Sequence, residues 1–71
     1  MSDVIPGTDI PKPEVQLTGA DGNALSVIGN VQGALRRAGA SDETISAFVE
    51  KATSGDYNNV LQTAMEYADV S

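Results

Sequence analysis

The chain has 71 residues and no cysteine, so it has room for one small domain and cannot form a disulfide framework or a thiolate metal site. Ten acidic residues against four basic ones give a net charge of −6, which disfavours direct binding to nucleic acid or to an anionic membrane surface. No apolar run reaches the roughly 18 residues of a membrane-spanning helix, and residues 1–3 do not resemble a signal peptide, which favours a soluble protein in the cytoplasm.

Residues 1–13 contain all three prolines of the chain and show no helical periodicity. This composition predicts an extended or partly disordered arm. Val4, Ile5 and Ile10 are apolar enough to dock on the rest of the chain, and Val4 and Ile5 could pair as a short strand. The remaining residues, 14–71, are expected to form a single small domain.

Residues 14–18 alternate between polar and apolar side chains, which predicts a short strand with Val15 and Leu17 on one face. A single strand needs a partner for its main-chain N–H and C=O groups. The candidates are the N-terminal arm, residues 67–70 near the other end of the chain, and the same strand in a second copy. The sequence leaves this choice open.

Residues 18–24 are expected to turn the chain from this strand into the first helix. Gly22 tolerates a positive φ, and Asn23 is a good N-cap because its side-chain oxygen can accept an N–H of the first helical turn. The loop lacks the lysine and the glycine spacing of phosphate-binding loops, and Asp21 would repel an anion. It also lacks the ligand spacing of an EF-hand calcium loop. A turn followed by a cap is sufficient to explain these residues.

Apolar residues recur at helical spacing from residue 24 to residue 38, which predicts an amphipathic helix. Arg36 and Arg37 suit the negative end of the helix dipole, and Gly39 is a good residue for the position after the C-cap. The predicted buried stripe consists of Ala24, Ile28, Val31, Leu35 and Ala38, widened by Leu25, Val27 and Ala34.

Gly29 and Gly33 lie inside this helix, where each weakens helix formation by about 1 kcal/mol relative to alanine. Because they are four residues apart, they share one side of the helix and leave a shallow groove there. The groove could serve internal packing in a crowded core or a contact with a second subunit or another partner.

Two further helices are predicted, with Ser41 and Asp56 as their N-caps and with short connections that fold them back on their neighbours. The predicted fold is therefore mainly α with a short β element (α+β): a three-helix domain preceded by a short strand and an N-terminal arm. The third helix is expected to bury Tyr57, Leu61, Ala64 and Ala68, with Val60 and Met65 beside them. The predicted core consists of Ile28, Val31, Leu35, Phe48, Val49, Leu61 and Met65.

The chain contains no histidine and no cysteine, and no serine, threonine, lysine or tyrosine lies in a recognisable catalytic motif. Asp21 and Asp56 stand at helix starts, where capping or turn formation accounts for them. We therefore expect no enzymatic activity, no catalytic residue, no metal site and no cofactor.

Short motifs spread over residues 14–70 resemble those of short acidic proteins that phages and other mobile elements encode. They are the G-x-D-G-N-A pattern at residues 19–24, Ala38-Gly39, the A-T-S-G-D-Y pattern at residues 52–57, and Leu61-Gln62. Most proteins of that set have no assigned activity, so the resemblance implies a phage origin and a location in the host cytoplasm rather than a mechanism. In size and charge the chain is also similar to inhibitors of host defence, including anti-CRISPR proteins.

Together these features favour a non-enzymatic acidic protein that covers the surface of a partner protein, such as a basic host protein. Partner contacts are expected at the acidic and polar positions of the second and third helices, which are Asp42, Glu43, Glu50, Asp56, Tyr57 and Asn58. The alternative is an oligomeric module that binds a small ligand or a nucleotide with the loops at 19–24 and 53–59, using Asp21, Gly22 and Asn23. Self-association could use Gly29 and Gly33 or the strand at 14–18.

Overall fold

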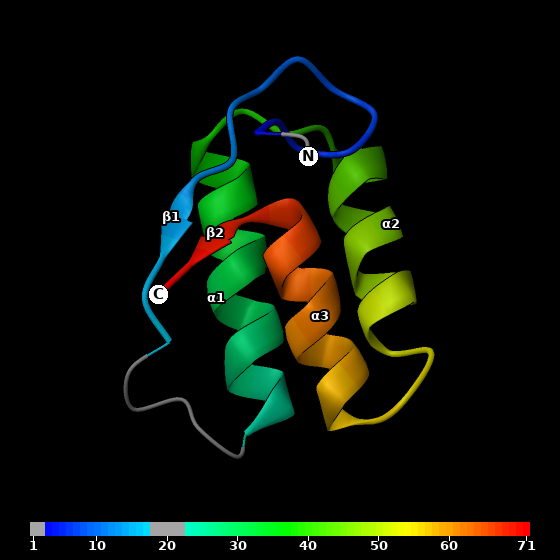
Figure 1. The fold of residues 1–71 in the computed structure, drawn as a ribbon. Coiled ribbons are helices and arrows are strands. Elements are labelled where there is room, and N and C mark those ends of the chain that lie inside the picture. Colours follow the sequence, from blue (N-terminus) through cyan, green and yellow to red (C-terminus); the bar gives the residue numbers. More distant parts are fainter. Residues whose placement is uncertain (1–2, 18–22) are drawn as a thin grey trace.

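The computed structural model describes residues 3–17 and 23–71. Within them the chain forms helices α1 (Ala24–Arg37), α2 (Asp42–Ala52) and α3 (Tyr57–Tyr67) and strands β1 (Glu14–Val15) and β2 (Asp69–Val70). The helices pack side by side, with α1 and α3 running in one direction and α2 in the other (Figure 1). The predicted fold class, mainly α with a short β element, is thus confirmed. No helix in this part of the chain combines the length and the apolar character that crossing a membrane requires.

All three helices begin at the N-caps that the sequence predicts. Asn23, Ser41 and Asp56 each accept a hydrogen bond from a main-chain N–H three residues further along, with lengths of 3.2, 3.2 and 3.0 Å. These bonds satisfy N–H groups that have no acceptor within the helix itself. The boundaries of the helices are therefore fixed by local side-chain chemistry.

The end of α1 also follows the prediction. Gly39 adopts a φ of 97°, in the left-handed region that favours glycine. Its N–H donates to the carbonyl of Arg36 at 3.1 Å, and the N–H of Ala40 donates to the carbonyl of Leu35 at 3.0 Å. This pair of bonds is the Schellman motif, which ends the helix and turns the chain toward α2.

The partner of β1 is β2, near the other end of the chain. The two strands are parallel, with Glu14 opposite Asp69 and Val15 opposite Val70. Of the three candidate partners, the C-terminal segment is the one that the structure shows. Val15 and Leu17 are both buried, as their alternation with polar residues predicts.

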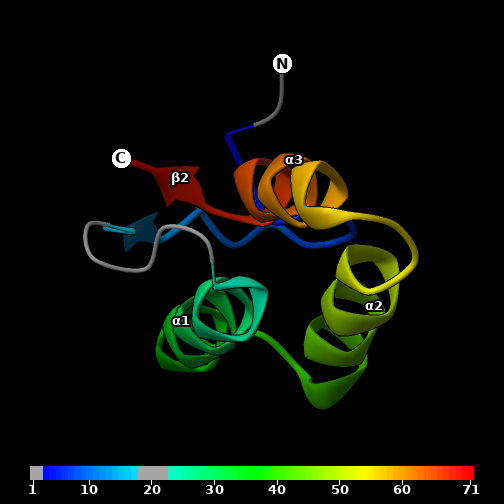
Figure 2. The same ribbon diagram turned by 90° about the horizontal axis from the view of Figure 1, so that it is seen from below.

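Residues 3–13 fold back on themselves instead of extending away from the domain. The N–H of Ile5 donates to the carbonyl of Ile10 at 2.8 Å, and the N–H of Lys12 donates to the carbonyl of Asp3 at 3.0 Å. Gly7 has a φ of 77° in the turn between them. The segment passes across one end of the helix bundle, and Ile5 is completely buried (Figures 1 and 2). Ile5, one of the three apolar residues that could dock, therefore packs against the rest of the chain.

The core prediction is wrong at Met65, and the predicted buried stripe of the first helix is wrong at Leu25. Met65 is 59% exposed and Leu25 is 80% exposed. The helix α3 turns a different face inward, and the residues on it are spaced as one helical stripe: Val60, Thr63, Ala64 and Tyr67. Of the other predicted core residues, Ile28, Val31, Leu35 and Phe48 are buried, and Val49 and Leu61 are partly buried against them.

Thr63 explains why the sequence misleads here. It is a polar residue that is almost fully buried, which apolar periodicity does not predict. Its hydroxyl donates to the main-chain carbonyl of Asn59 at 2.7 Å, so the polar group has a partner inside the helix. Tyr67, one turn further on, packs edge-on against Phe48 with 5.3 Å between the ring centroids.

Internal packing does not account for the glycines of α1. A Cβ atom added to Gly29 would meet no neighbour within 4 Å, and one added to Gly33 would meet only the end of the Arg37 side chain at 3.4 Å. Among the described residues no other backbone lies close to either glycine. Self-association through this side of α1 stays a prediction.

Candidate protein-binding groove

A groove of about 810 Å³ lies where α3, β2 and the N-terminal segment meet. We call it the α3–β2 groove. Its apolar lining comes from Pro6, Met65, Ala68 and Val70, and its polar lining comes from Asp3, Lys12, Gln62, Glu66 and Asp69. The N-terminal segment and the consecutive elements α3 and β2, which are far from it in the sequence, therefore build one recess.

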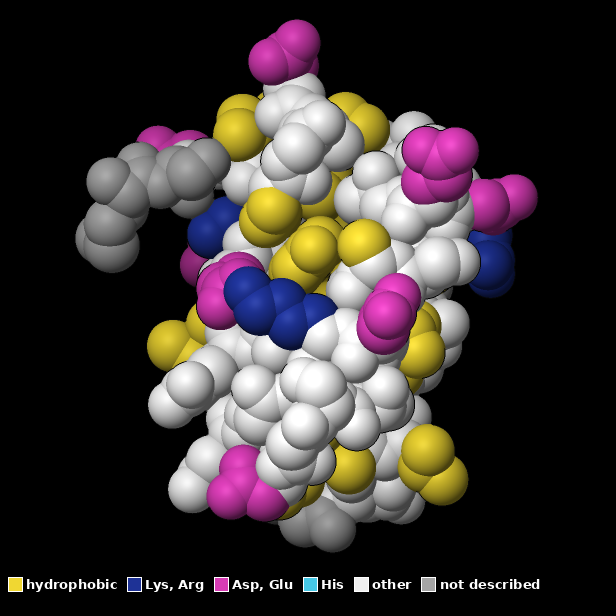
Figure 3. Space-filling view, turned by 90° about the vertical axis from the view of Figure 1, so that its right-hand side faces the viewer, with side chains coloured by type: hydrophobic (Ala, Val, Ile, Leu, Met, Phe, Trp, Pro, Cys, Tyr) yellow, Lys and Arg dark blue, Asp and Glu magenta, His cyan; other side chains and the backbone are white. Residues whose placement is uncertain are grey.

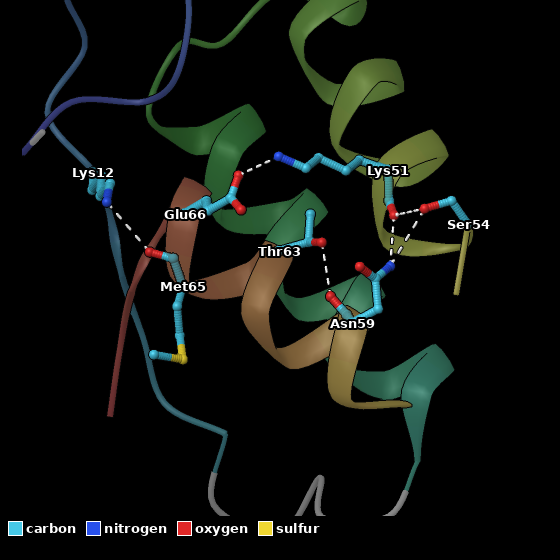
Figure 4. Close-up of polar contacts among 7 residues, drawn as sticks. All are labelled: Lys12, Lys51, Ser54, Asn59, Thr63, Met65 and Glu66. Carbon is cyan, nitrogen blue, oxygen red and sulfur yellow. Dashed lines mark hydrogen bonds and ion pairs between the residues drawn. The ribbon is translucent and has the colours of Figure 1, made fainter. Parts of the chain in front are cut away.

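Met65 is a large apolar side chain that stays exposed in this groove. It follows Ala64, which faces the core, so it projects from an adjacent face of α3. Its main-chain carbonyl accepts a hydrogen bond of 3.3 Å from the ammonium group of Lys12, which ties the N-terminal segment to α3 (Figure 4). The flexible thioether side chain of methionine adapts to irregular partner surfaces. The site thus presents an adaptable apolar contact on a fixed backbone.

The charge of the groove is predominantly negative, because three acidic side chains line it against one lysine. One of the acids is already paired: Glu66 accepts a 2.6 Å hydrogen bond from the ammonium group of Lys51 in α2. That bond raises the pKa of Lys51 above its ordinary value. Asp3 and Asp69 form no ion pair with any residue in the described ranges, so their charges are open to a cationic partner.

Two of the predicted partner contacts line a second groove, of about 410 Å³, between α1 and α2. Asp42 and Glu50 lie there together with Arg36 of α1. The guanidinium group makes the charge of this groove mixed. Glu43, which follows Asp42 in the first turn of α2, is exposed but does not line it.

The other predicted contacts lie at the opposite end of α2. The eleven residues of that helix separate Asp42 from the start of α3 by about 15 Å, since a helix rises about 1.5 Å per residue. Asp56, Tyr57 and Asn58 therefore lie away from Asp42 and Glu43, whereas Glu50, in the last turn of α2, lies toward their end of the helix. In Figure 3 acidic side chains are spread from one end of the face to the other, with hydrophobic side chains between them.

The two loops of the alternative ligand site do not present a shared set of free polar groups among the described residues. Asp21 and Gly22 lie outside the described residues, and the Asn23 side chain caps α1. In the loop at 53–59 the polar groups bond to the chain itself, since Ser54 and Asn59 both donate to the carbonyl of Lys51, at 2.7 and 2.8 Å. Residues 3–17 and 23–71 contain no group of three or more acidic, histidine or cysteine residues that could hold a metal ion.

Sequence reasoning missed the α3–β2 groove because it placed Met65 in the core. One local signal was present: the spacing of Val60, Ala64 and Tyr67 leaves Met65 off the buried stripe. The contributions of Asp3, Pro6 and Lys12 had no such signal, because they depend on how the N-terminal segment folds. Comparisons with protein-family models, with curated proteins and with solved structures find no match for this chain.

Proposed function

We propose that this protein is a non-enzymatic binding module that docks a basic segment of a partner protein in the α3–β2 groove. The observation that carries the proposal is the exposed side chain of Met65 in a recess that three acidic side chains line against one lysine, with Asp3 and Asp69 outside any ion pair among the described residues. Apolar contact would supply affinity, and the acidic groups would select a cationic partner.

The energetics support this use of the groove. Covering a side chain of this size contributes about 1.5 kcal/mol or more, and further apolar surface on Pro6 and Val70 adjoins it. The overall charge of −6 adds a long-range attraction toward basic proteins. A partner with an apolar residue flanked by lysine or arginine fits both features.

The resemblance to short phage proteins suggests a setting for this binding. A phage-encoded protein that occupied a basic surface of a host defence protein would inhibit it without any catalytic residue. The acidic positions of α2, Asp42, Glu43 and Glu50, are proposed as secondary contacts that strengthen the attraction.

Affinity capture from a host lysate with matched variants as baits tests the proposal. Met65→Asp removes the apolar contact of the groove, and Leu25→Asp makes the same change at an exposed leucine of α1 that does not line it. We expect proteins retained by the wild-type bait to be retained by Leu25→Asp and lost from Met65→Asp.

A third bait carries the charge reversals Asp42→Lys, Glu43→Lys and Glu50→Lys. Proteins lost from this bait but retained by Met65→Asp would move the site to α2 and overturn the groove as the docking surface. Proteins retained equally by all baits would contradict both locations.

A further inference from the structure

The outer edge of β2 has main-chain groups without a partner. On its inner side, the N–H of Asp69 donates to the carbonyl of Pro13 at 2.8 Å and the N–H of Ser71 donates to the carbonyl of Val15 at 3.0 Å. Since successive residues of a strand point their main-chain groups to opposite sides, the N–H and C=O of Val70 point away from β1. No residue in the ranges 3–17 and 23–71 forms a hydrogen bond with them.

This edge borders the α3–β2 groove. Ala68, Asp69 and Val70 line it together with Met65, in the last turn of α3. In Figure 2 the two strands lie side by side, with β1 on the side of α1, so the other edge of β2 faces away from α1. A chain that lay in the groove would therefore run along a free strand edge.

We propose that the groove binds a partner segment in extended conformation, which pairs with the main chain of Val70 as a third strand and directs lysine or arginine side chains toward Asp3 and Asp69. This inference rests on the proposed function and specifies the conformation and the charge of the bound segment. Main-chain pairing of this kind supplies affinity, and alternate side chains of the added strand supply specificity. About five residues, or 17 Å of strand, are enough to pass the edge and reach Met65.

Electrostatic repulsion disfavours a second copy of the same chain as the bound partner. Two β2 edges in contact would bring the Asp69 carboxylates together, and each copy carries a net charge of −6. A basic segment from another protein replaces that repulsion with attraction.

The direct test uses a capped pentapeptide of alternating lysine and valine, titrated into the isotopically labelled full chain and followed by NMR. We expect shift changes at Val70, Met65 and Asp69, and at least a tenfold slowing of hydrogen exchange at the Val70 amide. Binding should weaken with added salt. The same peptide with its lysines replaced by glutamate, and the same peptide with alternate amides methylated, should each bind at least tenfold more weakly.

A pair of variants isolates the main-chain contact. Val70→Pro removes an N–H that the fold does not use, whereas Val70→Ala keeps that N–H and shortens the side chain. We expect Val70→Pro to weaken binding of the lysine peptide at least tenfold and Val70→Ala to weaken it less. Melting temperatures of both variants report whether the fold is kept. If Val70→Pro unfolds, the test is the hydrogen-exchange rate of the wild-type Val70 amide. Slower exchange with the peptide bound supports strand pairing, and unchanged exchange overturns it.

The outcomes separate this inference from the proposed function. Binding that withstands Val70→Pro or amide methylation overturns strand pairing, and equal binding of the glutamate peptide overturns the basic character of the segment. If no extended peptide binds while Met65→Asp still releases captured proteins, strand pairing is wrong and the proposed function stands. If the Met65→Asp bait also retains every captured protein, strand pairing and the proposed function are both wrong.

Discussion

The side-chain amide of Asn59, in the first turn of α3, donates a 2.8 Å hydrogen bond to the main-chain carbonyl of Lys51, in the last turn of α2 (Figure 4). The same amide nitrogen lies 3.3 Å from the carbonyl of Ala52. Carbonyls at this end of a helix have no partner within the helix. A side chain of α3 therefore bonds to the end of α2, beside the Ser54 hydroxyl, and links the two helices.

Asn59→Ala should lower the free energy of unfolding by about 1–2 kcal/mol, because it removes a donor that both carbonyls share and leaves Lys51 with the bonds from Ser54 alone. Asn59→Asp should cost more, since a carboxylate cannot donate and its charge opposes the negative end of the helix dipole. Urea denaturation measures both. The control is Asn58→Ala at the exposed neighbouring position, and a loss there equal to that of Asn59→Ala would contradict the role of the amide.

Ile5→Ala should destabilise the protein by about 2–4 kcal/mol, because this side chain is completely buried against the helices. Leu25→Ala, at an exposed position, should change stability by less than about 0.5 kcal/mol. Thermal and urea denaturation of the two variants give the comparison. Equal effects would mean that residues 3–13 do not belong to the cooperative unit.

Gly29→Ala should raise the free energy of unfolding by about 1 kcal/mol, because a Cβ meets nothing there and alanine favours the helix. Gly39→Ala should lower it by about 1 kcal/mol or more, since the φ of 97° is strained for alanine. Light scattering on wild type and Gly29→Ala adds the oligomeric state. A wild-type dimer that the alanine disrupts would show that a second copy packs on this side of α1.

The ion pair of Lys51 and Glu66 should give a stabilisation that depends on high pH. The hydrogen bond to Glu66 raises the pKa of Lys51 in the folded protein above its ordinary value near 10.5. The stabilisation is therefore fully present below that value and is lost as the pH rises through the raised pKa. It is small at any pH, because both side chains are about half exposed.

Urea denaturation of Glu66→Gln and wild type at pH 7 and pH 11 measures this effect. The difference between them should shrink at pH 11. In a Lys51→Arg background it should persist at pH 11, since arginine stays charged there. If the difference in stability shrinks equally with Lys51 and with Lys51→Arg, the pH dependence comes from other groups that titrate at high pH.

The features that the sequence predicts well are local. The caps of the helices bond to main-chain groups only a few residues away, so they can be predicted without knowledge of the fold. They are Asn23, Ser41, Asp56 and Gly39. The buried face of α3 was misjudged because Thr63, a polar residue, occupies part of it. Its hydroxyl is satisfied by a carbonyl one turn back, which periodicity of apolar residues does not reveal.

The candidate site is the least predictable part. Its wall of Ala68 and Val70 depends on β2 pairing with β1, and its rim at Asp3 and Lys12 depends on the turn of the N-terminal segment. Both arrangements join residues that are distant in the chain. The charge of the site was in part foreseeable, because acidic residues outnumber basic ones throughout the sequence.

The pairing of Val15 with Val70 has a consequence for how the molecule assembles. Bringing these residues together closes a loop that contains most of the chain, at an entropic cost of roughly 3–4 kcal/mol. The helices, whose main-chain hydrogen bonds are local, can form before that cost is met. During synthesis β2 must leave the exit tunnel before it can pair with β1, so the wall of the groove that contains Val70 forms after the three helices have emerged.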